Sequence, residues 1–220
     1  MKGSTSHMPS RNVVKEFITE SYYHVYNRGV EKRKIFQNDN DYTVFLGLLK
    51  KYLSGENNNK NNRHGFDIFN GKADLLAYCL MPTHFHLLFY QYEKEALSKI
   101  MRRISTGYAM YFNIRYNRVG SLFQGTYKAS LISEDDYLQH ISRYIHLNPY
   151  SGKVVSTLKD LENYPYSSLR QFIGKDPAGF CDSKMILGLF SGQDAYKQFV
   201  LDHANYQRQL EYIKHLTLEN

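Results

Sequence analysis

The alternation of hydrophobic and polar positions predicts strands and helices in turn along the first 150 residues. Residues 22–26 alternate among aromatic and β-branched side chains, which predicts a strand that ends at Asn27-Arg28-Gly29. A helix should follow, capped by Asn38 or Asp39. Its apolar positions recur at helical spacing at Tyr42, Phe45, Leu46, Leu49 and Leu53. The polar stretch 56–63 then predicts a loop.

The central third of the chain predicts further strands and a long helix. Residues 66–69, the turn Asn70-Gly71 and residues 75–80 indicate a strand or hairpin, which leads into a strand at about 84–90. A helix is expected over 95–117, because its apolar residues trace one face. These are Leu97, Ile100, Met101, Ile104, Tyr108 and Tyr111. A turn-rich segment, 120–125, then precedes a strand at 128–132.

A last regular helix is predicted over about 134–148. Ser133 can cap it, acidic residues follow at its start, and Pro149 is expected to end it. The resulting order of elements predicts an α+β fold with helices packed on an antiparallel sheet. After residue 150 the pattern weakens. A turn at 164–168 and helices near 183–190 and 194–216 predict a small, mainly helical C-terminal extension.

Charge and composition favour an anionic partner. The formal net charge is +7 and the isoelectric point is near 9.2, which suits nucleic acid. Twenty Tyr and thirteen Phe provide rings that could stack on bases. Residues 95–128 include six basic residues and one acidic residue, Glu95, which favours a surface that binds nucleic acid. The alternative interpretation is a solvated helix face. The six are Lys99, Arg102, Arg103, Arg115, Arg118 and Lys128.

Other features of the sequence indicate the cellular compartment of the protein. Cys79 and Cys181 are far apart and follow no CxxC spacing, which indicates a reduced, intracellular protein without a structural zinc site. Neither a membrane-spanning run nor a secretory leader is apparent. Residues 1–8 are interpreted as an expression-vector remnant and left out of the functional argument.

The run His84-Phe85-His86 is the strongest candidate for chemistry. A strand points residues i and i+2 to the same side, so both imidazoles should project together while Phe85 and Leu87 enter a core. Two convergent histidines can chelate a metal. The alternative is a satisfied polar histidine beside a surface one, and this triplet alone does not decide between the two.

The helix predicted over 134–148 carries a second candidate group. His140, Tyr144 and Asn148 are spaced i, i+4 and i+8, which places an imidazole, a phenol and an amide in line. A tyrosine can accept a phosphoryl group when its phenol is activated or the phosphate is neutralised. An ordinary amphipathic tyrosine is the alternative in a chain with twenty of them.

Several segments together resemble the single-tyrosine transposases with a His-hydrophobic-His signature, the insertion-sequence and REP-associated group. The signature matches residues 81–88. Further matches, in the same order, are Tyr23-His24-Val25 with Arg28-Gly29, residues 120–128, and residues 144–149. The resemblance runs over residues 22–150 and rests on the combination of these segments.

The resemblance implies a fold, an activity and a set of site residues. The fold would be ferredoxin-like, as in RNA-recognition domains, and the activity would be metal-dependent cleavage and rejoining of single-stranded or hairpin DNA through a 5′-phosphotyrosine. Tyr144 would be the nucleophile, and His84, His86 and Asn148 would hold Mg²⁺ or Mn²⁺. His140 would be an alternative ligand or a proton-transfer group. Arg28, Arg102, Arg103, Arg115, Arg118 and Lys128 are expected to contact DNA.

Two rival classes remain open. A non-catalytic RNA-recognition-like module could share the fold, but it would carry aromatic residues where this chain has His84 and His86. A domesticated relative could keep the fold and nucleic-acid binding yet lose mobility. A metallohydrolase would need a further ligand near the pair, and position 88 is leucine. The expected organisation is a catalytic domain over 9–150 and an extension over 151–220, in a cytoplasmic, nucleoid-associated and bacterial protein that could form a homodimer. No membrane partner is expected.

Overall fold

The computed structural model describes residues 17–54, 69–132 and 135–209. Strands and helices alternate in it as the hydrophobic pattern predicts. Up to residue 132 they are β1 (Ser21–Arg28), a 3₁₀ turn (Val30–Lys32), α1 (Asp39–Leu53), β2 (Ala73–Met81), β3 (His84–Gln91), α2 (Ala96–Arg115) and β4 (Lys128–Ile132). The second part holds α3 (Asp135–Ser151), α4 (Leu158–Glu162), α5 (Leu169–Phe172), α6 (Lys184–Leu187) and α7 (Gln193–Leu201).

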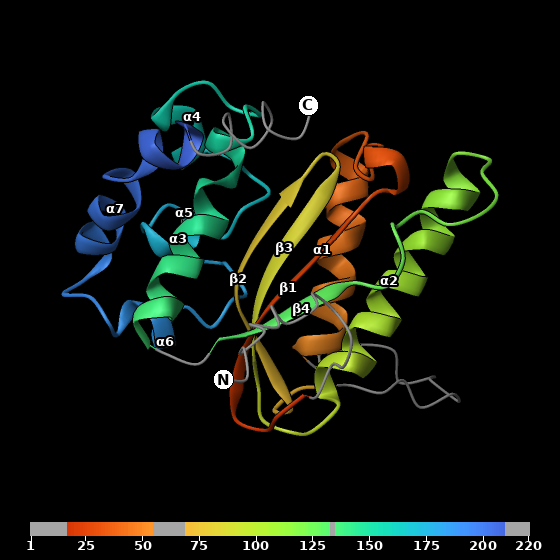
Figure 1. Ribbon diagram of the computed structural model, residues 1–220, viewed down its shortest axis with the longest axis horizontal. Coiled ribbons are helices and arrows are strands. Elements are labelled where there is room, and N and C mark those ends of the chain that lie inside the picture. The colour runs from red at the N-terminus through yellow and green to blue at the C-terminus, as the bar shows by residue number, and fades with distance from the viewer. Residues whose placement is uncertain (1–16, 55–68, 133–134, 210–220) are drawn as a thin grey trace, which may run out of the picture.

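The strands form one antiparallel sheet in the order β2-β3-β1-β4. Because β3 lies between β1 and β2, the unit is a split βαβ arrangement of the ferredoxin-like kind. Helices α1 and α2 lie on one face of the sheet, and α3 with the C-terminal helices lies on the other (Figure 1). This confirms the predicted α+β fold and the small helical extension.

Each face of the sheet has its own hydrophobic core. Val25, Phe85 and Leu87 point toward α1 and α2, whereas Leu88 and Ile132 belong to the core beneath α3. The alternation follows from the two-residue period of a strand. It also confirms that Phe85 and Leu87 turn away from the histidine pair, and so places the histidines on the α3 side.

The predicted helix boundaries are partly right. Asn38 is the cap of α1, since its side chain accepts hydrogen bonds from the backbone N–H groups of Asn40 and Asp41. The prediction that Pro149 ends its helix is wrong, because α3 continues to Ser151. Proline removes one N–H donor from a helix. Pro149 lies so close to the C-terminal end of α3 that only the final turn of the helix is affected.

The C-terminal extension is built from shorter helices than the sequence predicts. The helix expected over 183–190 is reduced to α6, and the one expected from 194 ends at Leu201, although residues 204–209 are again helical. Helices α4 and α5 were not predicted. Residues 1–16, 55–68, 133–134 and 210–220 lie outside the described ranges. They include the suggested vector remnant, the loop at 56–63, the cap at Ser133 and most of the strand at 66–69.

A buried polar network attaches the extension to α3. The ring of His146 is fully buried; its Nδ1 lies 2.7 Å from the Tyr196 hydroxyl and its Nε2 lies 2.8 Å from the Ser168 hydroxyl. Ser168 is also hydrogen-bonded to the backbone of Tyr78 in β2. One imidazole thus joins α3, α7 and β2 through hydrogen bonds that solvent does not reach.

Acidification should destabilise the fold partly through His146. Burial lowers the pKa of His146 from 6.5 to about 3. Below pH 6.5 the His146 imidazole binds a proton in the unfolded chain, whereas in the folded chain it does so only near pH 3. The free energy of unfolding therefore falls as the pH falls between these values, by up to about 1.4 kcal/mol per pH unit. Urea unfolding at several pH values should give a shallower dependence for His146→Gln than for the wild-type protein. Equal slopes for the two proteins would refute this role.

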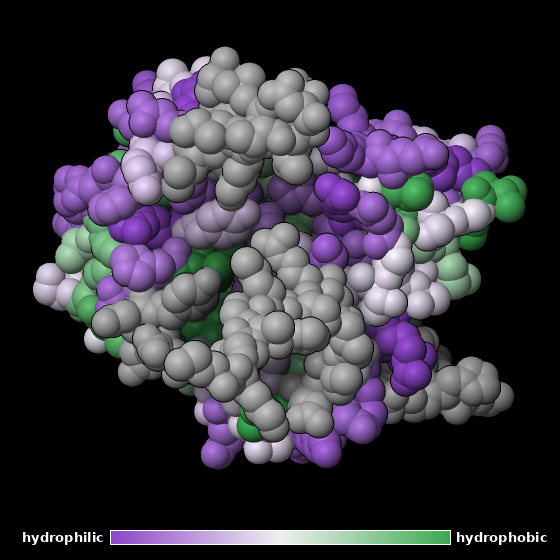
Figure 2. Space-filling model, viewed as in Figure 1, coloured by the Kyte–Doolittle hydropathy of each residue, from purple (hydrophilic) through white to green (hydrophobic). Residues whose placement is uncertain are grey.

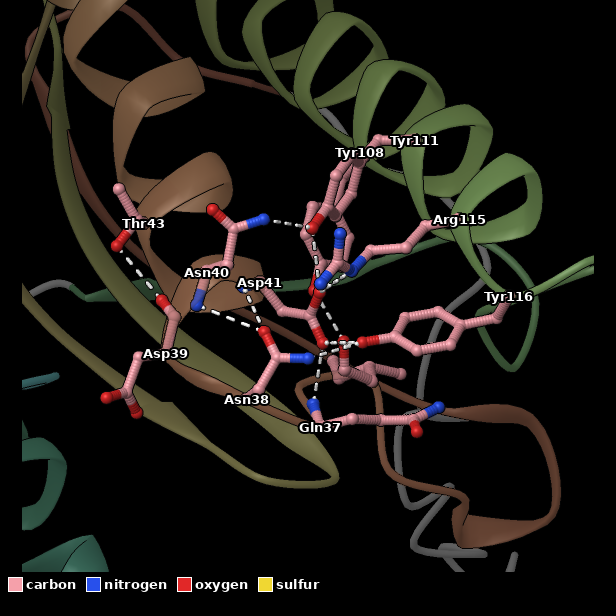
Figure 3. Close-up of polar contacts among 11 residues, drawn as sticks. Gln37, Asn38, Asp39, Asn40, Asp41, Thr43, Tyr108, Tyr111, Arg115 and Tyr116 are labelled. Carbon is pink, nitrogen blue, oxygen red and sulfur yellow. Dashed lines mark hydrogen bonds and ion pairs between the residues drawn. The ribbon is translucent and has the colours of Figure 1, made fainter.

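A buried carboxylate joins α1 to the far end of α2 (Figure 3). Asp41 is fully buried and accepts hydrogen bonds of 2.8 Å from the backbone N–H of Gln37 and from the hydroxyls of Tyr111 and Tyr116. The guanidinium Nε of Arg115 lies 3.8 Å from it. A buried charge requires such partners, so this cluster fixes the contact between the two helices.

The outer surface of α2 changes character along its length. Arg102 and Arg103 are exposed in the first half, whereas Met110 and Ile114 are 60% and 76% exposed in the second. Figure 2 shows apolar surface at this end of the molecule. The basic face expected over 95–128 is therefore interrupted. Among the described helices, none is both long and apolar enough to cross a membrane.

Candidate active site

The pairing of β1 with β3 brings a third histidine to the predicted pair. Arg28 lies opposite His84, Tyr26 opposite His86, and His24 opposite Leu88, all on the face covered by α3. His24 is therefore a diagonal neighbour of His86 across the two strands, a separation that long side chains can bridge.

The imidazole of His86 contacts each of the other two. Nε2 of His24 lies 2.9 Å from Nδ1 of His86, and the two rings are nearly parallel at 17° with centroids 5.1 Å apart. The ring of His84 is perpendicular to that of His86, also at 5.1 Å, and its Nδ1 lies 3.0 Å from the Thr83 hydroxyl. Because Nδ1 is engaged in both His84 and His86, Nε2 is the atom that each would offer to a metal.

Burial keeps two of these rings uncharged. His24 is 7% and His86 6% exposed. Burial lowers the pKa of His24 to about 4, and it lowers that of His86 well below the ordinary value, with further lowering from the neighbouring His24 and His84. An imidazole must be neutral to bind a metal, and burial keeps His86 in that form at neutral pH.

Helix α3 places Tyr144 over His24 and His86. The phenol ring lies 5.4 Å from the ring of His86 and 6.0 Å from that of His24, edge-on to both. A cavity of about 430 Å³ lies at this point between the sheet and α3. It is lined by His24, Tyr26, His86, Ser130, His140, Ile141 and Tyr144. The predicted nucleophile and one predicted ligand therefore meet at one opening.

The other two candidate residues on α3, Asn148 and His140, differ from Tyr144 in burial and in their contacts. Asn148 is buried and does not line the cavity; its amide nitrogen donates to the backbone carbonyl of Tyr144 at 2.8 Å, which leaves Oδ1 as its possible ligand atom. His140 is exposed at the cavity, and its Nδ1 accepts a hydrogen bond of 2.9 Å from Arg143. A neutral ring that accepts at Nδ1 carries its proton on Nε2, which makes it a donor there rather than a ligand.

The three predicted donors, His84, His86 and Asn148, would together suit a weakly held divalent ion. In the ranges that the structure covers, no three His, Cys, Asp or Glu side chains are arranged to hold a metal. Two imidazole nitrogens and an amide oxygen would leave other positions for water or phosphate oxygens. Such a mixed set fits Mn²⁺ better than Mg²⁺, because Mg²⁺ prefers oxygen ligands.

The six basic residues predicted to contact DNA are distributed over both faces of the sheet. Lys128 lies beside the cavity, with its ammonium group 6.0 Å from the Tyr26 ring centroid, and Arg28 hydrogen-bonds Gln124 at the end of β1. The other four belong to α2 or to the segment after it, on the opposite face. Of these, Arg102 lines a separate cavity of about 950 Å³ and Arg115 is paired with Asp41.

His24, Tyr26 and Ser130 are the site residues that sequence reasoning missed. His24 and Tyr26 sit at alternate positions of a strand that was predicted, and His24 belongs to a segment that matched the family pattern. Their proximity to His86 depends on the register of β1 against β3. A periodic pattern within one strand does not specify that register.

Comparisons with known proteins bear on the family and the fold of the chain. Residues 17–148 match the sequence model of the family described as "Transposase IS200 like". No curated protein matches the chain. A solved structure described as a REP-associated tyrosine transposase bound to a REP hairpin aligns with a TM-score of 0.51 and 12% identity, covering 77% of this chain and 89% of that one. This likeness supports the fold.

A second solved structure, a putative transposase from Deinococcus radiodurans R1, aligns with a TM-score of 0.38 and 15% identity. It covers 61% of this chain and 95% of the other.

Proposed function

Because this chain belongs to the family of IS200-like transposases, we propose that it cleaves and rejoins single-stranded DNA through a covalent bond to Tyr144. The family is one of enzymes that cut DNA and transfer its strands. The observation that carries the finer proposal is the edge-on position of the Tyr144 ring over His24 and His86 at an open cavity. A phenol, a histidine such as His86 that could hold a metal, and space for a phosphate are what such a reaction requires.

The reaction would exchange one phosphoester for another. The phenol oxygen of Tyr144 attacks the phosphorus, the bond between phosphorus and the 3′-oxygen breaks, and the DNA 5′-phosphate becomes joined to the tyrosine. The phenol proton passes to water in the cavity, and water returns a proton to the departing 3′-oxygen, which leaves as a hydroxyl. His140 can donate a hydrogen bond from Nε2–H to that oxygen. A divalent ion held by His84, His86 and Asn148 would supply positive charge to the phosphate.

Hairpin-containing DNA is the substrate class that we propose. The solved structure of the REP-associated tyrosine transposase, of which the alignment covers 89%, holds that protein bound to a REP hairpin. Lys128 provides a positive charge beside the cavity mouth, and Tyr26 offers an aromatic ring there. Phosphate contact and base stacking are the usual means of holding single strands.

The packing of α3 weighs against a purely binding role. Modules that bind RNA on a sheet use an open face on which bases stack. In this chain the corresponding face is largely filled, since Leu88 and Ile132 pack beneath α3 and its neighbours. The cavity lined by His24, His86 and Tyr144 stays open on this face.

End-labelled DNA tests the proposed function. Incubation with Mn²⁺ and a single-stranded hairpin oligonucleotide should give an SDS-stable protein adduct that carries the 3′ label. The released 5′ fragment should end in a hydroxyl that a polymerase can extend. Chelation with EDTA should prevent both products, because the metal supplies the phosphate's countercharge. Cleavage without any protein-linked label would show hydrolysis by water and refute the proposal.

A further inference from the structure

We propose that His24 is a positioning residue that fixes the proton and the ring orientation of His86, so that Nε2 of His86 faces the metal. The inference rests on the proposed function, because it assigns a role around the same metal. Its basis is the 2.9 Å hydrogen bond between Nε2 of His24 and Nδ1 of His86, between two rings that are both less than a tenth exposed.

The hydrogen bond allows two proton arrangements, and only one of them permits metal binding. If His24 donates from Nε2, the neutral His86 ring accepts at Nδ1, carries its proton on Nε2 and cannot ligate there. If His86 donates from Nδ1, its Nε2 has a lone pair for the metal. His24 must then accept at Nε2 and keep its own proton on Nδ1. Metal binding at His86 therefore requires His24 as an acceptor.

The same geometry argues against His24 as a third ligand. Its Nε2 is directed at Nδ1 of His86, and no set of three His, Cys, Asp or Glu ligands occurs in the described parts of the chain. Histidines that bind metals usually donate their other N–H to a carboxylate, a carbonyl or water. In this chain a second imidazole occupies that place.

The surroundings of His24 keep it in this position. It lies on β1, which is paired on one side with β3 and on the other with β4. The ring of Tyr26 stacks on it at 5.1 Å and 25°, and the edge-on ring of Tyr144 lies 6.0 Å away. A central strand and two aromatic neighbours leave the imidazole little freedom to turn. His24 thereby links the proposed ligand to the proposed nucleophile.

Metal affinity measured without DNA tests the role of His24. His24→Phe keeps a ring for the stack but removes the acceptor, and it should weaken Mn²⁺ and Zn²⁺ binding by about 10- to 100-fold. His24→Gln retains an acceptor oxygen and should restore most of the affinity. Tyr22→Phe, on the same face of β1, serves as the control and should bind like the wild-type protein. Equal affinities for His24→Phe and wild type, or equal losses in the Phe and Gln variants, would overturn the inference.

A measurement on the wild-type protein covers the case in which His24→Phe does not fold. With ¹⁵N-labelled histidine and Zn²⁺ as a diamagnetic probe, ring NMR should show His86 and His24 both protonated at Nδ1. A proton on Nε2 of His86 in the zinc-bound protein would refute the assignment. Neither readout involves DNA, so failure of the transposase proposal would appear separately, as an absent DNA adduct with the metal-affinity order unchanged.

Discussion

Replacing Tyr144 with phenylalanine should abolish the covalent DNA adduct. The substitution removes the phenol oxygen and retains the ring that lies edge-on to His24 and His86, so the cavity should keep its shape. Without a nucleophile the rate of strand cleavage should fall by at least about 10⁴-fold. DNA affinity should be retained, because phosphate contacts come from other residues. Single-turnover assays with labelled hairpin DNA would measure the rate, and a filter-binding assay would measure the affinity.

Tyr150 offers a matched control on the same helix. It is 8% exposed, and its hydroxyl donates to the side-chain carbonyl of Asn205 at 3.0 Å, so it is occupied in packing α3 against the C-terminal segment. Tyr150→Phe should lower stability slightly and leave the adduct intact. If Tyr144→Phe forms the adduct as fast as Tyr150→Phe does, Tyr144 is not the nucleophile.

Removal of either proposed histidine ligand should have the second-largest effect. His84→Ala and His86→Ala should each reduce cleavage by about 10²- to 10⁴-fold, which corresponds to several kcal/mol of lost charge stabilisation. The His86 variant should be the more severe, because His86 is buried and supported by His24, whereas His84 is partly exposed. Adduct formation over a Mn²⁺ titration would compare them.

Controls for the histidine variants separate metal loss from general damage. His203→Ala removes an exposed histidine of the C-terminal segment and should leave cleavage unchanged. Thermal unfolding of each variant checks that the sheet is intact, and DNA binding in the presence of EDTA should match that of the wild-type protein. Normal cleavage by both His84→Ala and His86→Ala would show that a metal held by these histidines is not needed for the reaction.

The sequence predicts most of what depends on local period. The two-residue period of β3 correctly separates the side of His84 and His86 from that of Phe85 and Leu87. The helical spacing of α3 places His140 and Tyr144 at one cavity. These predictions succeed because each concerns side chains on one element, whose directions follow from its backbone geometry.

Contacts between elements could not be predicted from the periodic pattern, and the meeting of Tyr144 with His86 was expected only from the family resemblance. His24 reaches His86 only through the register of β1 with β3, and the pairing of Arg115 with Asp41 only through the packing of α2 on α1. Net charge over 95–128 could not reveal that a buried carboxylate lies beside one of these cations. The end of α3 was missed for another reason, because a helix tolerates proline in its final turn when few residues follow.

Mass spectrometry of the digested adduct tests the central claim most directly. Tyr144 follows Arg143, so trypsin should release it in the peptide 144–153, whereas Tyr26, the other tyrosine of the cavity, lies in a separate peptide that ends at Arg28. After nuclease trimming, fragmentation of peptide 144–153 should place the nucleotide on Tyr144 and not on Tyr150. A nucleotide attached to the Tyr26 peptide, or to Tyr150, would contradict the claim that Tyr144 accepts the DNA strand.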